Sequence, residues 1–93
     1  MIRSFKDKGT ERVFRGERER RLHPDIARRA RMRLQRIDAA TAISDLQVPP
    51  SHRLEELAGN RTGQWSIRIN DQYRVCFEFR DGDAYEIEVT DYH

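Results

Sequence analysis

The chain has 93 residues and a net charge of +2, with charged and hydrophobic residues each making up 37%. This composition suits one compact domain spanning residues 1–93 and excludes an unfolded polyelectrolyte, because enough apolar side chains are present for a core. The opening residues are too charged for a signal peptide, and no apolar run is long enough to span a membrane. We therefore expect a soluble cytoplasmic protein with no membrane partner.

Charge is divided unevenly along the chain. Residues 1–36 hold 13 Lys or Arg against 5 Asp or Glu, whereas residues 37–93 hold 5 against 11. Only Lys6 and Lys8 are lysines, and the guanidinium groups of the other basic residues suit bidentate contact with phosphate. The basic front half favours RNA or DNA as a partner, while the alternative is that these side chains solubilise helix faces.

The first quarter of the chain is predicted to form a strand, a short helix and a loop. Residues 1–5 alternate between apolar and polar side chains and are predicted to form the strand. The helix is expected to have Thr10 as its N-cap and to end at Gly16. Residues 16–25 are highly charged without periodicity, so we expect a mobile loop that ends around Pro24.

A long helix is predicted from Asp25 to Ala40. Apolar side chains recur on one stripe of it at spacings of four, four and three, at positions Ile26, Ala30, Leu34 and Ile37. Arginines take other positions, at Arg28, Arg29, Arg31, Arg33 and Arg36. Residues 41–50 are expected to add one helical turn before two prolines end it.

From residue 52 the pattern changes to the period of two that is typical of strands. Residues 52–59 predict a strand with an irregularity, because Leu54 and Leu57 are three positions apart. Three regular strands are predicted after it, and Asp-Gly-Asp between the last two indicates a hairpin. One face of these strands is apolar, through Trp65, Ile67, Ile69, Tyr73, Val75, Phe77, Phe79, Tyr85, Ile87 and Val89.

Helices that precede an antiparallel meander indicate an α+β domain, in which the helices pack on the apolar face of the sheet. Alternation assigns the opposite face to Ser66, Arg68, Arg74, Cys76, Glu78, Glu86, Glu88, Thr90 and Tyr92. Arg68, Arg74 and Tyr92 are expected to meet there, within reach of the terminal His93. The alternative is that the arginines and glutamates form cross-strand ion pairs on a solvated surface.

Arginines beside a histidine, a tyrosine and carboxylates suit cleavage of RNA by its own 2′-hydroxyl. That reaction needs a base for the hydroxyl proton, an acid for the leaving 5′ oxygen and cations near the transition state, and it requires no metal. Imidazole can perform either proton transfer near neutral pH. No metal-ligand spacing or glycine-rich phosphate motif is present, so no cofactor is predicted. His23, His52 and the strand residue Cys76 are expected to have no part in the chemistry.

The chain closely resembles the HigB toxins of the RelE/ParE superfamily in two long stretches, GNRTGQWSIRINDQYRVCFEF and GDAYEIEVTDYH. MIRSFKDKGTERVF and RLQRIDAAT fit the same family, so the resemblance covers essentially the whole chain. It implies a RelE-like fold and a bacterial type II toxin that cuts mRNA in the ribosomal A site without a metal. It also implies a HigA-like helix-turn-helix antitoxin, which would carry any binding to operator DNA.

The resemblance also implies roles for individual residues. It assigns His93 as acid or base, Arg74 to the scissile phosphate, and Asp91 and Tyr92 to orienting the base or the RNA. Glu55 and Ala58 stand where some members have a histidine and a lysine, so Glu55 either replaces the histidine as a base or has no catalytic part. Arg68 is added as a phosphate contact, and the contacts to 16S rRNA of the 70S ribosome are expected from Arg28, Arg29, Arg31, Arg33 and Arg36.

Two other functions remain open at the level of sequence. One is a gyrase poison of the ParE kind, because one fold supports different activities. The other is a weakly active or non-enzymatic component that binds antitoxin or RNA. The terminal Asp-Tyr-His favours the nuclease.

Overall fold

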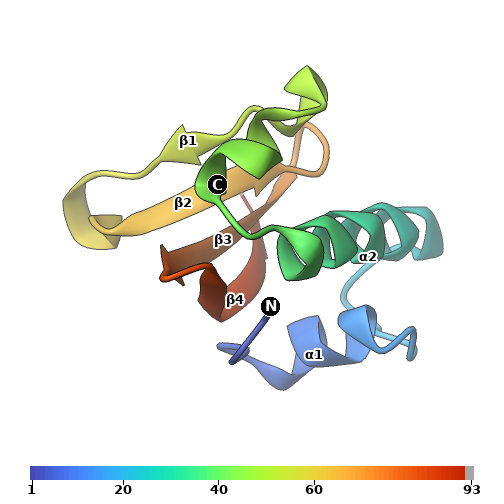
Figure 1. The fold of residues 1–93 in the computed structure, drawn as a ribbon. Coiled ribbons are helices and arrows are strands. Elements are labelled where there is room, and N and C mark those ends of the chain that lie inside the picture. The colour runs from blue at the N-terminus through green and yellow to red at the C-terminus, as the bar shows by residue number, and fades with distance from the viewer. Residues whose placement is uncertain (92–93) are drawn as a thin grey trace.

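The computed structural model describes residues 1–91 and has two α-helices on one face of a four-stranded antiparallel sheet (Figure 1). The helices are α1 (Lys8–Phe14) and α2 (Pro24–Ala39). In order across the sheet, the strands are β1 (Glu55–Glu56), β2 (Gln64–Arg68), β3 (Tyr73–Arg80) and β4 (Asp83–Asp91). The predicted α+β arrangement is confirmed. Among the described residues, no helix combines the length and apolar character needed to cross a membrane.

The opening residues run beside β4 but do not form the strand predicted at 1–5. Ile2 and Phe5 make only isolated parallel bridges, to Ala84 and Ile87. Between these bridges the N–H of Glu86 donates to the Ser4 hydroxyl, at 2.8 Å. The Ser4 hydroxyl thus takes the place that a backbone carbonyl has in a regular strand pair. The regular pairing of the opening residues with β4 is therefore interrupted here.

Helix α1 begins earlier than the sequence predicted. The Asp7 carboxylate, and not Thr10, is the N-cap, and it accepts a hydrogen bond from the Thr10 N–H at 2.6 Å. Thr10 is buried, and its hydroxyl accepts a hydrogen bond from the N–H of Val89 at 2.9 Å. The prediction for Thr10 was wrong because this hydroxyl ties α1 to β4, a contact between residues far apart in sequence.

The charged segment between the helices is packed, which contradicts the predicted mobile loop. Leu22 is buried, and the Glu19 side chain is only 5% exposed. The Glu19 carboxylate lies 3.2 Å from Arg12 Nη2 and 3.6 Å from Arg21 Nε. Burial alone would raise the pKa of Glu19, but the Arg21 N–H and the charges of Arg21 and Arg12 hold it below its usual range. This ionised carboxylate fastens the segment to α1.

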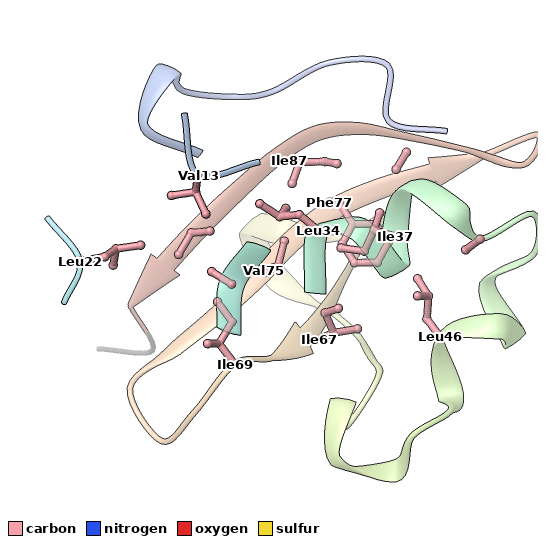
Figure 2. Packing of buried hydrophobic residues seen from close by; sticks show 14 residues of the cluster. Val13, Leu22, Leu34, Ile37, Leu46, Ile67, Ile69, Val75, Phe77 and Ile87 are labelled. Atoms are coloured by element: carbon pink, nitrogen blue, oxygen red, sulfur yellow. The ribbon is translucent and has the colours of Figure 1, made fainter. Parts of the chain in front are cut away.

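The core lies between α2 and the sheet, as the apolar stripe of the long helix predicted. Leu34 and Ile37 of α2 are fully buried and face Val75, Phe77 and Ile67 of the sheet (Figure 2). Burying a side chain of this size stabilises the fold by about 1.5–3 kcal/mol. This packing fixes which face of the sheet remains open.

Strand β4, the last of the predicted strands, has a β-bulge that the sequence did not reveal. Cys76 pairs with Glu88, but Glu78 pairs with Tyr85, so β4 carries one extra residue at this point. Glu86 lies in this stretch, and its φ of 51° is in the left-handed region. The extra residue reverses the alternation, so Ala84 is buried in the core and the prediction that Tyr85 points inward was wrong.

The strand expected at residues 52–59 is reduced to the two residues of β1. A 3₁₀ helix, Pro50–His52, precedes it, and Arg53 has a left-handed φ of 46°, so the backbone becomes extended only afterwards. Leu57 is buried although it follows the strand. The helical turn predicted in residues 41–50 is confirmed as a 3₁₀ helix, Ile43–Gln47.

Candidate functional site

We call the sheet face opposite α2 the outer face. The strand register places one row of residues across all four strands of this face: Glu55, Ser66, Cys76 and Glu88. In the next row Arg68 of β2 pairs with Arg74 of β3, and Arg74 pairs with Thr90 of β4. The structure thus brings Arg68 and Arg74 together as alternation predicted, because no helix covers them and the register between β2 and β3 is regular.

Arg74 is half-buried and shares the outer face of β3 with Cys76. Burial raises the pKa of the Cys76 thiol, and the nearby charges of Arg74 and Arg61 oppose the rise without cancelling it. The thiol is 1% exposed and stays protonated at neutral pH, so the prediction of a buried strand residue is confirmed.

Arg61 is a residue of this face that sequence reasoning missed. It ends the 3₁₀ helix Gly59–Arg61 before β2, and its Nη2 lies 2.8 Å from Glu88 Oε1 on β4. Its Nη1 donates to Gln64 Oε1 at 3.1 Å. The bond to Glu88 raises the pKa of Arg61, and Lys6 Nζ lies 3.6 Å from the same oxygen of Glu88. Arg61 has no strand register, so alternation could not assign it to a face.

Arg68 connects the outer face to the helical side of the molecule. Its side chain forms an ion pair with Asp71 in the turn between β2 and β3. Its backbone carbonyl accepts a hydrogen bond from Arg33 Nε of α2 at 2.9 Å. The predicted cross-strand pairs with glutamate are therefore replaced, for Arg68, by a pair within its own turn.

The arginines of α2 do not form one uniform solvated surface. Arg31 Nε donates to the Phe14 carbonyl at 3.2 Å, and Arg36 Nη2 donates to the Val48 carbonyl at 2.7 Å. Burial lowers the pKa of Arg33, and the neighbouring charges of Arg29, Arg36 and Arg68 lower it further. A basic cluster thus extends from α2 to the end of β2. Arg28 pairs with Asp25 at 3.1 Å and Arg29 is exposed.

Two of the predicted site residues, Glu55 and Asp91, lie on the two edge strands of the sheet. Glu55 is exposed on the edge strand β1, about 10 Å from the β3 backbone at the normal strand spacing. Asp91 is the last residue of β4, pairs with Tyr73, and its Oδ2 accepts a hydrogen bond from Gln72 Nε2 at 3.0 Å. The predicted placement of Tyr92 and His93 near Arg74 lies outside the described residues.

Features elsewhere in residues 1–91 are separate from the outer face. An open cavity of about 610 Å³ lies on the helical side and is lined by Val13, Leu22, Ala27 and Arg31, among others. In the part of the chain that the structure describes, no three His, Cys, Asp or Glu side chains are grouped to hold a metal ion. His23 caps α2 by accepting a hydrogen bond from the Asp25 N–H at 3.1 Å.

Comparison with known proteins identifies the family. Residues 3–93 match the model of the HigB-like toxins, described as RelE-like toxins of type II toxin–antitoxin systems. Toxin HigB-1 of Vibrio cholerae is 45% identical over 85 residues, with 90% of each chain covered. Endoribonuclease HigB of Proteus vulgaris is 39% identical over 93 residues, with 100% of both chains covered.

A solved structure supports the fold independently. A chain of the heterotetrameric YoeB–YefM toxin–antitoxin complex from Staphylococcus aureus superimposes with a TM-score of 0.64, at 18% sequence identity. The match covers 100% of this chain and 98% of the other. The fold, the match of the family model along almost the whole chain and the two close relatives agree, and the chain belongs to the HigB-like family of RelE-like type II toxins.

Proposed function

We propose that this toxin is a ribosome-dependent endoribonuclease that cuts mRNA in the ribosomal A site. The observation that carries the proposal is the pair Arg68 and Arg74, held side by side on the open face of the sheet. The nuclease class is further supported by the whole-length relative from Proteus vulgaris, which is named an endoribonuclease.

The proposed reaction is an internal phosphoryl transfer. The ribose 2′ oxygen gives its proton to a base and bonds to the adjoining phosphorus, while the bond from phosphorus to the 5′ oxygen breaks and that oxygen takes a proton from an acid. Arg74 binds the scissile phosphate and, with Arg68, stabilises the charge that develops on it. His93 is the proposed acid or base, Glu55 is proposed only as a base, and Asp91 and Tyr92 orient the base or the RNA.

The remaining partners are proposed from charge and from the family. The exposed Arg29 and the basic cluster around it contact 16S rRNA, with the exposed Arg28 next to it in α2. A HigA-like antitoxin neutralises the toxin, as membership in a toxin–antitoxin family supports. A ribosomal target places the protein in the bacterial cytoplasm.

Mapping of mRNA 5′ ends in a reaction with purified ribosomes tests the proposal. The wild-type toxin should produce cuts in phase with codons, and both Arg74→Ala and His93→Ala should lower the rate about 10²–10³-fold, the usual effect of removing one well-placed group. Arg20→Ala, in the segment between the helices, is the matched control and should cut normally. Intact mRNA together with DNA breaks at gyrase sites would instead assign the protein to the gyrase poisons.

A further inference from the structure

The cluster of Arg61, Glu88 and Lys6 is a part of the outer face that the mechanism above does not use. We propose that Arg61 is a second phosphate-binding residue, which holds the phosphodiester next to the one at Arg74. The inference rests on the proposed nuclease function and adds a contact to the substrate that the sequence did not indicate.

The position of Arg61 is the first argument. Its guanidinium reaches Glu88, which is the strand partner of Cys76, and it affects the pKa of the Cys76 thiol together with Arg74. Arg74 and Cys76 are two residues apart on β3, a separation of about 7 Å along a strand. Arg61 thus reaches the row of the outer face next to the row of Arg74, and a phosphodiester bound there would adjoin the scissile one.

The way in which Arg61 is held is the second argument. Glu88 contacts one terminal nitrogen of the guanidinium and Gln64 contacts the other, so its plane is fixed before any ligand arrives. The contact with Gln64 is a hydrogen bond, and it engages one of the five N–H groups that a guanidinium carries. The Arg61 side chain is 30% exposed, whereas the Glu88 side chain beneath it is 16% exposed. The cation is therefore the more accessible member of the pair.

Local charge is the third argument. Arg61 and Lys6 both contact Glu88, so this carboxylate is outnumbered by two cations within its own cluster. Arg74 adds a further positive charge nearby. A structural ion pair would need only one cation for Glu88. The surplus favours an anion, and a phosphodiester is the anion that an RNA substrate supplies.

The affinity of the toxin for 70S ribosomes measures the contact between Arg61 and the phosphodiester. The ribosomes carry an mRNA with a 2′-O-methyl group at the cleavage site, which prevents attack by the 2′ oxygen on the phosphorus. Arg61→Gln should bind about tenfold more weakly, since it loses one charge-assisted hydrogen-bonding group. The slope of log affinity against log salt should fall by about 0.7, the value for one phosphate of a single strand. Arg20→Gln makes the same charge change in the segment between the helices and should leave both quantities unchanged.

Two further variants separate phosphate binding from a structural role. Arg61→Lys retains the charge and should keep the wild-type salt slope. The double variant Arg61→Gln/Glu88→Gln removes the ion pair as a whole and should remain as weak as Arg61→Gln. Recovery of wild-type binding in the double variant would show that Arg61 only neutralises Glu88, and this would overturn the inference.

Controls distinguish this inference from the proposed function. The effect of Arg61→Gln should disappear on ribosomes without mRNA, because the contact is to the substrate. If the wild type cuts mRNA but Arg61→Gln behaves like Arg20→Gln, this inference alone fails. If the wild type neither binds programmed ribosomes nor cuts their mRNA, the proposed function fails with it.

Discussion

At the scale of single residues, arginine has two different tasks in this protein. On α2, Arg31, Arg33 and Arg36 donate hydrogen bonds to backbone carbonyls of other segments and so connect the helix to its surroundings. On the outer face, Arg68 and Arg74 lie beside each other on neighbouring strands. A count of basic residues cannot separate these tasks, because the first depends on which carbonyl lies within reach.

Arg33 and Arg29 offer a direct test of this difference. Arg33→Lys should lower the free energy of unfolding by about 1 kcal/mol, because an ammonium on a flexible stem cannot reproduce the Nε–H bond to the Arg68 carbonyl. Arg29→Lys, one turn earlier and exposed, should change it by less than about 0.5 kcal/mol. Urea denaturation measures both, and equal losses would contradict the structural role of Arg33.

His52 predicts a pH dependence of stability. Its side chain is buried, and its Nδ1 lies 3.2 Å from the Leu46 carbonyl. Burial lowers the pKa of His52 below its ordinary 6.5; the bond to Leu46 opposes this shift, and the charges of Arg33 and Arg36 add to it. The unfolded chain therefore takes up a proton before the folded chain does as the pH falls. Stability should be full above the unfolded-state pKa and decrease as the solution becomes more acidic.

Chemical denaturation at about pH 7 and at about pH 5 measures this dependence. The wild type should lose more stability between the two conditions than His52→Asn, which keeps a hydrogen-bond donor but does not titrate. The variant should be less stable at the higher pH, where the neutral imidazole fits its site. An identical loss in both proteins would assign the pH dependence to other groups.

At the scale of elements, the segment between the helices depends on a glycine in α1. Gly9 is buried, and a methyl group there would collide with Glu19 Oε2 and with the Arg21 guanidinium. The absence of a side chain lets the Glu19 carboxylate lie directly against the helix. The sequence shows a charged stretch without periodicity, but the packing of Glu19 on Gly9 orders it.

Gly9→Ala should therefore destabilise the protein, although alanine is favoured over glycine in a helix by about 1 kcal/mol. We expect a loss of about 1–3 kcal/mol, the usual range for overpacking. In a Glu19→Ala background the collision with the carboxylate is removed and the largely exposed Arg21 side chain can move aside, so the same substitution should become neutral or stabilising. Urea denaturation midpoints of the wild type, the two single variants and the double variant measure the coupling between Gly9 and Glu19. Equal effects of Gly9→Ala in both backgrounds would contradict that coupling.

At the scale of the whole molecule, the helices lie on one side of the sheet and leave the other side open to the proposed substrate. The last large core residue of β4 is Val89, and the candidate site at the end of the chain follows it directly. Core and proposed chemistry are thus separate in sequence.

Deletion of Tyr92 and His93 should abolish mRNA cutting and leave the melting temperature and antitoxin binding largely unchanged. The reason is that these residues follow the core, whereas the proposed acid–base group is His93. Cleavage assays, thermal melting and copurification with the antitoxin measure the three properties. A truncated toxin that still arrests growth would refute the role assigned to the chain end.

Particular residues show how far the sequence predicts the site. Alternation was sufficient for Arg68 and Arg74, because β2 and β3 pair without interruption. It failed at Tyr85, because the extra residue Glu86 reverses the two faces of β4. The bulge leaves no local signal, since the alternating pattern of side chains continues through it.

The sequence by itself determined the family, the α+β class, the apolar stripe of α2 and the arginine pair on the sheet. These follow from short-range periodicity and from long motifs, which are properties of neighbouring residues. Only the tertiary structure decided that Arg61 meets Glu88, that Glu19 packs on Gly9 and that Arg33 supports Arg68. Each of these contacts joins segments whose separation in space is set by how the helices, loops and sheet pack together, and no local pattern encodes that distance.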